Sequence, residues 1–202
     1  MTKIGILAVQ GSFAEHSAAV AACGADPRPV RLPADLDGIG GLVLPGGEST
    51  AMERLLKKYE LIELLRALIR SGLPVYGSCA GMILLANQLS DGAAGQETLG
   101  GIDMTVRRNA FGRQRDSFEA DLDITGVTAE GAPLRAVFIR APVVEQVGQH
   151  VQILASADSA AQPGRIVAVR QGNLLATSFH PEVTGDLRVH QYFVDLARQA
   201  GK

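Results

Sequence analysis

The chain has 202 residues, of which 47% are hydrophobic and 20% charged, a composition typical of a globular protein. A chain of this length buries about 70% of the surface that its unfolded form exposes, so it needs neither disulfides nor a structural metal. The net charge of -2 gives no reason to expect nucleic acid or an anionic membrane surface as a partner.

The two cysteines, Cys23 and Cys79, are too few for a disulfide framework. The N-terminal segment MTKIGILAVQG lacks the features of a signal peptide. No apolar run reaches the ~18 residues that a membrane-spanning helix needs. We therefore expect a cytoplasmic protein with reduced thiols.

The first half of the chain alternates between short apolar runs and helical periodicity. The runs that predict buried strands are Lys3–Val9, a weaker Pro29–Leu32, Gly41–Leu44 and Leu73–Gly77. The periodic segments that predict helices are Ser12–Cys23, 49–70 and Ala80–Leu89. Ser12, with Glu15 three residues later, has the spacing of a capping box.

Strands that alternate with helices predict a mostly parallel sheet with helices on both faces. In such sheets ligands bind beyond the carboxyl ends of the strands. Three segments follow strands directly and are therefore expected there: Gln10–Gly11, Pro45–Glu48 and Ser78–Gly81.

The second half has short alternating runs separated by Gly, Pro and Asp, which predict mostly antiparallel strands. These runs are Ile102–Val106, Ser117–Leu122, Arg135–Ile139, Val151–Ala155, Arg165–Arg170 and Leu174–Ser178. A last helix is predicted at about Gly185–Arg198. We find no repeat or linker, so residues 1–202 are expected to form one domain.

The strongest chemical signal is Gly77–Ser78–Cys79–Ala80–Gly81, which lies between a predicted strand and a predicted helix. The pattern G-x-C-x-G has the form of a nucleophile elbow with Cys in place of Ser. The start of a helix directs backbone N–H groups at the sulfur and favours the reactive thiolate. The N–H of Ala80 is then placed to bind an oxyanion. An isolated cysteine is more often buried and inert, but the elbow reverses that interpretation.

A nucleophilic thiol needs a base, and His180 is the best candidate because Glu182 follows it by two residues at the end of an apolar strand. In an extended chain, residues two apart point to the same side, so Glu182 is expected to orient His180, with Pro181 holding that geometry. Alone, this pattern more often marks surface residues; with the elbow it predicts a Cys-His-Glu triad.

The segment Pro45–Ser49 carries a glycine pair, Gly46 and Gly47, that lets the backbone approach a ligand and offers a second oxyanion donor. By itself it is simply a strand-to-helix turn. His16 and His190 lie at helical positions and are interpreted as surface or packing residues, and Cys23 as structural. No Cys/His spacing indicates zinc.

These motifs resemble those of the class I, or triad, glutamine amidotransferases. Within that class, the chain resembles the glutaminase subunits of pyridoxal 5′-phosphate synthases. The segments that carry the resemblance span residues 8–184: AVQGSFAEH, LPGGEST, GSCAGMILLA, RRNAFGRQRDSFEADL, VFIRAP and SFHPEVT. The fourth segment is the most specific. Two departures from the family's motifs are mild: Ala8–Val9 replaces the Gly–Leu pair often seen before QG, and Ser78 stands where Thr is common.

The resemblance implies a flavodoxin-like α/β amidotransferase fold, with a mostly parallel central sheet flanked by helices and additional antiparallel strands in the second half. It implies Cys79 as nucleophile, His180 as general base and acid, and Glu182 as the orienting carboxylate. It also implies glutamine contacts from Gly47, Glu48, Ser49, Arg108, Ile139 and Arg140, and an oxyanion site of Gly46, Gly47, Ala80 and Gln10.

The activity that the resemblance implies is hydrolysis of L-glutamine to glutamate and ammonia. The ammonia would pass to a synthase subunit, within a large hetero-oligomer, for pyridoxal 5′-phosphate synthesis. The glutaminase itself would need no cofactor.

Three alternatives remain open at this point. A different triad amidotransferase subunit would share the elbow and the HPE motif, although the specific fourth segment argues against it. A regulatory subunit with a decayed site is disfavoured because all three triad residues are present. A thiol hydrolase or redox sensor would leave Glu182 and the glycine loop without a role.

Overall fold

The computed structural model describes residues 1–92, 95–108, 117–159 and 162–201. The helices are α1 (Phe13–Ala22), α2 (Ser49–Lys58), α3 (Ile62–Arg70), α4 (Ala80–Leu85) and α5 (Arg188–Ala200), with 3₁₀ turns at Pro33–Leu36 and Pro181–Val183. The first strands are β1 (Lys3–Leu7), β2 (Asp26–Val30), β3 (Gly41–Leu44), β4 (Val75–Ser78), β5 (Ala86–Leu89) and β6 (Ile102–Arg107). The later ones are β7 (Ser117–Leu122), β8 (Leu134–Ile139), β9 (Val143–Val147), β10 (Gln152–Ser159), β11 (Gln162–Gln171) and β12 (Leu174–Thr177).

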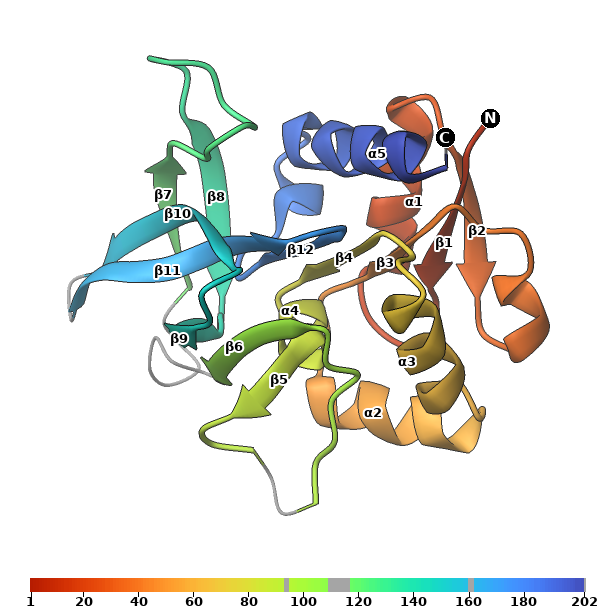
Figure 1. Cartoon of the computed structure of the whole chain (residues 1–202). Coiled ribbons are helices and arrows are strands. Elements are labelled where there is room, and N and C mark those ends of the chain that lie inside the picture. Colours follow the sequence, from red (N-terminus) through yellow and green to blue (C-terminus); the bar gives the residue numbers. More distant parts are fainter. Residues whose placement is uncertain (93–94, 109–116, 160–161, 202) are drawn as a thin grey trace.

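The main sheet has the strand order β2-β1-β3-β4-β12-β11-β9-β6-β5, and β10 pairs with β11 (Figure 1). The strands from β2 to β12 in this order are parallel, whereas β11 pairs antiparallel with both β12 and β9. A separate hairpin, β7–β8, lies at one side of the sheet. The predicted fold class, a mostly parallel sheet with antiparallel strands from the second half, is confirmed.

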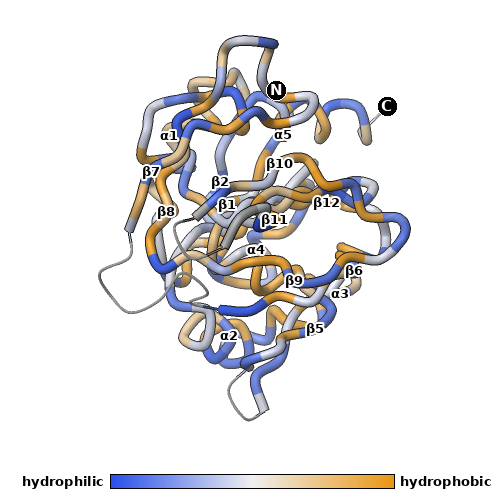
Figure 2. Tube along the Cα trace, turned by 90° about the vertical axis from the view of Figure 1, so that its left-hand side faces the viewer, coloured by the Kyte–Doolittle hydropathy of each residue, from blue (hydrophilic) through white to orange (hydrophobic). Residues whose placement is uncertain are grey.

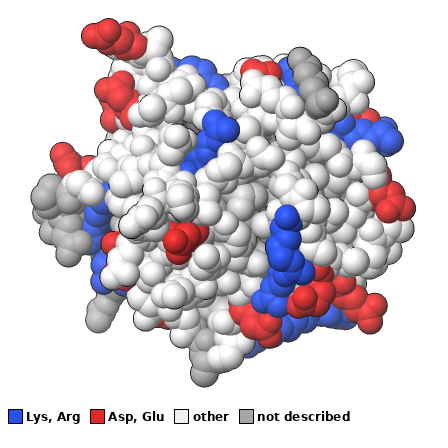
Figure 3. All heavy atoms as spheres, in the orientation of Figure 1, with Lys and Arg blue, Asp and Glu red and all other residues white. Residues whose placement is uncertain are grey.

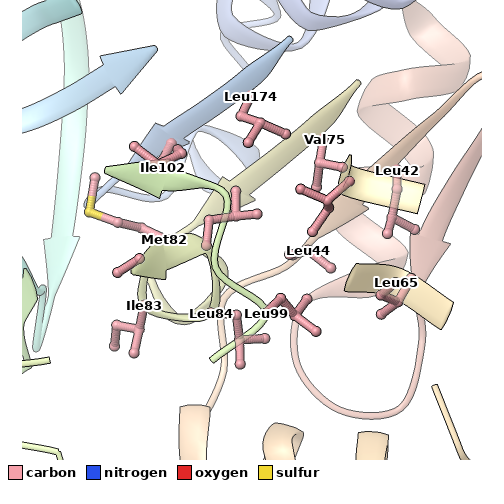
Figure 4. Packing of buried hydrophobic residues seen from close by; sticks show 14 of the residues in the cluster. Leu42, Leu44, Leu65, Val75, Met82, Ile83, Leu84, Leu99, Ile102 and Leu174 are labelled. Atoms are coloured by element: carbon pink, nitrogen blue, oxygen red, sulfur yellow. The ribbon is translucent and has the colours of Figure 1, made fainter. Parts of the chain in front are cut away.

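The hydrophobic core lies in two layers, one on each face of the sheet. In β3, Leu42 and Leu44 pack with the buried faces of α2 and α3, while Val43 packs on the other face with α1 and α5. This is the alternation expected of a strand buried on both faces. Figure 1 shows the two helix pairs on opposite sides, and Figure 4 shows Leu65 of α3 beside Leu42. The trace in Figure 2 is accordingly hydrophobic along the central strands and hydrophilic in many of the outer turns.

The predicted helix at 49–70 is two helices, α2 and α3, so this expectation was wrong. The break falls at Glu60, whose φ of 58° is left-handed and ends α2. Leu61 and Ile62 after the break are apolar because they are buried in the core, so the helical spacing of apolar residues continues across the turn. Periodicity alone therefore did not reveal it.

The predicted helix Ala80–Leu89 was also wrong in its second half. It ends at Leu85, and Ala86–Leu89 forms β5, parallel to β6. The side chain of Asn87 accepts a hydrogen bond from the N–H of Gly101 at 2.9 Å, which ties this edge strand to the next segment. Strand β9 was not predicted, and β12 lies parallel to β4 in the centre of the sheet.

Charged side chains on the face in Figure 3 are sparse over the centre and gather at the lower right, where α2 and α3 lie in Figure 1. There, Lys57 pairs with Glu53 at 2.5 Å and with Glu97 at 2.8 Å, and Arg66 contacts the same Glu97 at 3.1 Å. These pairs fasten the segment around Glu97 to both helices. No helix in the described part of the chain combines the length and apolar character needed to cross a membrane.

Candidate active site

Cys79 lies in a sharp turn between the end of β4 and the start of α4. Its φ of 49° and ψ of -102° are strained for a residue with a side chain. The turn requires glycine on both sides: a Cβ on Gly77 would collide with the backbone of Gly81, and a Cβ on Gly81 would collide with the carbonyl of Leu44. The geometry is that of a nucleophile elbow, as the sequence predicted.

His180 and Glu182 form a pair, with 2.8 Å between His180 Nδ1 and Glu182 Oε1. The sequence predicted an extended backbone between them, but the structure has a 3₁₀ turn at Pro181–Val183. Pro181 occupies the first position of this turn, where its fixed φ and missing N–H are tolerated. The pairing is therefore observed, while the local geometry predicted for it was wrong.

The electrostatics of this pair follow from burial and hydrogen bonding. Burial alone lowers the pKa of His180, but hydrogen bonds with Cys79 and Glu182 outweigh it and raise the pKa from 6.5 to about 10. Burial alone raises the pKa of Glu182, but interactions with His16 and His180 hold it well below its ordinary value. A protonated His180 therefore lies between the sulfur of Cys79 and an ionised Glu182.

Cys79 and His180 open into a cavity of about 310 Å³. Its lining includes most of the predicted site residues: Gln10, Gly47, Glu48, Ser49, Cys79, Arg108, Ile139, Arg140 and His180. Three predicted residues lie just behind this lining: Glu182 beyond His180, Ala80 buried at the start of α4, and Gly46. A Cβ on Gly46 would collide with the ring of His180, so Gly46 packs directly against that imidazole.

The glycine loop is held in place from the N-terminal segment. The backbone N–H of Glu48 donates to Gln10 Oε1 at 2.9 Å, and the N–H of Ser12 donates to the carbonyl of Gly46 at 3.2 Å. The carboxylate of Glu48 accepts from the N–H groups of Thr50 and Ala51 and so caps α2. Burial raises the pKa of Glu48, but these backbone hydrogen bonds outweigh it and lower the pKa.

Arg108 is fixed at the wall of the cavity by three hydrogen bonds. Its guanidinium donates to Thr50 Oγ1 at 3.3 Å, to Gln96 Oε1 at 2.8 Å and to the carbonyl of Asp91 at 2.9 Å. Gln96 also donates to Ser49 Oγ at 3.2 Å, so one side chain bridges Ser49 and Arg108. Asp91 and Gln96, which accept two of these hydrogen bonds, were not among the predicted site residues.

A family model described as the SNO glutamine amidotransferase family matches residues 6–199. The chain belongs to this family. The membership confirms the amidotransferase class that the elbow and the HPE motif predicted.

Named relatives agree with this assignment. The chain is 61% identical over 198 residues to the pyridoxal 5′-phosphate synthase subunit PdxT of Nocardia farcinica, covering 98% of this chain and 87% of the relative. It is 61% identical to the PdxT of Kineococcus radiotolerans, covering 97% of this chain and 95% of that one. The predicted resemblance to the glutaminase subunits of pyridoxal 5′-phosphate synthases is confirmed.

Solved structures show the same fold. A glutamine amidotransferase crystal structure matches with a TM-score of 0.86 and 42% identity over 96% of this chain and 98% of that chain. The PurLQS structure from Thermotoga maritima matches with a TM-score of 0.72, covering 100% of this chain and 99% of that chain, but its 17% identity supports the fold alone.

Sequence reasoning missed the residues that surround Glu182. Ser12 does not cap α1 with its side chain; its hydroxyl donates instead to Glu182 Oε1 at 2.7 Å, so the capping-box prediction was wrong. His16 and His190, interpreted from the sequence as surface or packing residues, are fully buried. Ile83, one turn after Cys79 in α4, lines the cavity, and its i+4 spacing was the available signal. The segment 109–116 of the most specific sequence block lies outside the described residues.

The His180–Glu182 pair makes a testable statement about pH. We expect His180 to keep its ring proton until pH approaches about 10, and we expect Glu182→Gln to lower that midpoint by removing the carboxylate charge. The measurement is a ¹⁵N NMR titration of histidine-labelled protein. A midpoint near 6.5 in the unaltered protein would contradict the ion-pair geometry.

The same pair should affect stability with a defined sign. A raised pKa for His180 gives stabilisation that is complete below pH 6.5 and lost as pH rises through about 10. A lowered pKa for Glu182 gives stabilisation that is complete above pH 4.5 and lost as pH falls. The difference in unfolding free energy between the unaltered protein and Glu182→Gln should therefore be largest between these limits and shrink toward pH 10.

Proposed function

We propose that this chain hydrolyses L-glutamine to glutamate and ammonia through Cys79, His180 and Glu182, with a thioester at Cys79. The observation that carries the proposal is the elbow thiol beside the imidazole of His180 at one cavity, with the buried carboxylate of Glu182 hydrogen-bonded behind that imidazole. The amidotransferase membership supplies the reaction class. The whole chain, 1–202, acts in this proposal as one glutaminase domain.

The first step is attack of the Cys79 thiolate on the side-chain amide carbon of glutamine. His180 holds the proton that the thiol has lost and gives it to the departing nitrogen, so ammonia leaves as the carbon–nitrogen bond breaks. Water then attacks the thioester, with His180 as its base, and glutamate is released. Glu182 keeps the imidazole oriented and stabilises its positive charge throughout.

The negative oxygen of each tetrahedral intermediate needs hydrogen-bond donors. We assign one to the N–H of Ala80 at the start of α4 and one to the Gly46–Gly47 loop, with Gln10 beside that loop. Gln10 is close enough that a Cβ on Gly47 would collide with its side-chain oxygen. Each such donor is worth on the order of 3 kcal/mol in the transition state.

The charges around the cavity suit a zwitterionic amino acid. Arg108 and Arg140 line the same cavity as the carboxylate of Glu48, and a volume of about 310 Å³ lies at the lower end of small-ligand sites. Gly47, Ser49 and Ile139 complete the proposed glutamine contacts. Arg140 has a φ of 47°, so both it and Cys79 are strained residues facing the substrate.

The names of the relatives support a partner. We propose that ammonia passes to the synthase subunit of a pyridoxal 5′-phosphate synthase, within a large hetero-oligomer, and serves pyridoxal phosphate synthesis. We place this activity in the cytoplasm, consistent with two cysteines that are free thiols.

The nucleophile is tested by comparing the two cysteines. Cys79→Ala should abolish glutamate release from glutamine, measured with and without an added synthase subunit, because no other thiol reaches the cavity lining described here. Cys23→Ala is the matched control: Cys23 is buried near the end of α1 and should leave turnover near that of the unaltered protein. Glutamine turnover by Cys79→Ala would refute the assignment. If the synthase subunit stimulates neither the unaltered protein nor Cys23→Ala, the proposed partner is rejected.

Neighbouring arginines offer a test of substrate binding. Arg108→Ala should raise KM for glutamine at least about tenfold because a charge-assisted contact to the substrate is lost. Arg107→Ala is the control, since Arg107 pairs with Glu145 at 2.9 Å away from the cavity lining. Steady-state kinetics with equal effects from both substitutions would remove Arg108 from the proposed binding site.

A further inference from the structure

Two histidines outside the triad lie buried beside it. His16 of α1 and His190 of α5 are both 0% exposed, and His16 Nδ1 lies 2.9 Å from His190 Nε2. The ring of Tyr76 makes a T-shaped contact with each imidazole, with centroid distances of 6.0 Å. Burying two imidazoles in a protein interior is unfavourable unless their nitrogens are used, so this pair requires an explanation.

The pair reaches the triad through its carboxylate. His16 Nε2 lies 3.5 Å from Glu182 Oε1, with both side chains fully buried, and 3.0 Å from Ser78 Oγ in the elbow. The same Glu182 oxygen accepts hydrogen bonds from Ser12 and from His180. Glu182 Oε2 is buried without a hydrogen-bond partner among the described residues. Stabilisation of this buried anion therefore depends on the groups gathered at Oε1.

Hydrogen-bond accounting selects one tautomer for each ring. His190 Nδ1 is buried without a partner in the described part of the chain, so a hydrogen there would be an unsatisfied donor. The single hydrogen of a neutral His190 then sits on Nε2 and is donated to His16 Nδ1. His16 Nδ1 is thereby an acceptor, and a neutral His16 carries its hydrogen on Nε2, facing Ser78 and Glu182.

We propose that His16, locked in this tautomer by His190, is a positioning residue that orients the Glu182 carboxylate and keeps it ionised for its work on His180. The inference rests on the proposed glutaminase mechanism. It adds two buried residues, His16 and His190, behind the Glu182 carboxylate of the triad. A carboxylate that must hold an imidazolium needs its own partners, just as the histidine does. His16 touches neither substrate nor the reacting atoms and acts through Glu182.

A double-mutant cycle separates this role from simple packing. His16→Leu should lower kcat for glutamine hydrolysis, with synthase subunit present, roughly 10- to 100-fold, the size of effect that loss of a partner one shell out has at metal sites. In the Glu182→Gln background the same change should cost less than about twofold, because the partner through which His16 acts is gone. An equal cost in both backgrounds, or full activity of His16→Leu, would overturn the proposal.

Two further variants guard against loss of the fold. His16→Gln keeps an N–H near the position of Nε2 and should recover most of the activity. Tyr76→Phe is the matched control: it removes a hydroxyl from the same buried region, where that hydroxyl bonds Thr177 at 2.9 Å, and should leave kcat near that of the unaltered protein. Activities of the glutamine and leucine variants that fall equally would indicate packing alone.

A spectroscopic measurement tests the inference without using activity. In ¹⁵N-histidine-labelled protein, His16 and His190 should both show the Nε2–H tautomer, and the His16 signal should shift in Glu182→Gln. Observation of Nδ1–H tautomers, or no shift, contradicts the proposal. If the unaltered protein with synthase shows no glutamine hydrolysis while the tautomers are as expected, the proposed function fails and the hydrogen-bond arrangement stands.

Discussion

One buried carboxylate organises this site. Glu182 accepts a hydrogen bond from the hydroxyl of Ser12, which is 170 residues away in the chain, and another from the imidazole of His180, only two residues away. It thereby joins the N-terminal segment before α1 to the segment after β12. An anion buried in this way is tolerated only while those partners surround it. The orientation of His180 consequently depends on the packing of α1 and α5 over one face of the sheet.

The second constraint is the elbow that presents Cys79. Gly77 and Gly81 have no room for a side chain, and Cys79 takes a left-handed φ between them. Strain of this kind typically costs 1–3 kcal/mol per residue, and it persists here because the strands and helices on either side are fully buried. The parallel pairing of β4 with β3 and β12 fixes that turn beside the loops that follow those strands, namely the glycine loop and the His180 segment.

Much of this arrangement was predictable from local signals. The elbow and the glycine pair each follow a strand of the predicted parallel sheet, so their meeting at one edge of that sheet could be expected. The HPE motif follows β12, which was predicted among mostly antiparallel strands, so its place beside them in the parallel part of the sheet could not. The break at Glu60 and the switch from α4 to β5 could not be predicted. Buried apolar residues on either side of each break keep the spacing of a helix in the sequence. The contacts of Ser12, His16 and His190 were missed for another reason: they join residues more than 160 positions apart in the chain, which no local pattern reports.

The central claim is that Glu182, through His180, prepares Cys79 to form a thioester. The most direct measurement is the rate at which a glutamyl adduct appears on the Cys79 peptide after mixing with glutamine and synthase subunit, read by mass spectrometry of acid-quenched samples. The account predicts an adduct on Cys79 that forms rapidly in the unaltered protein and far more slowly in Glu182→Gln. Equal rates in the two proteins, or turnover with the adduct on another residue, would contradict it.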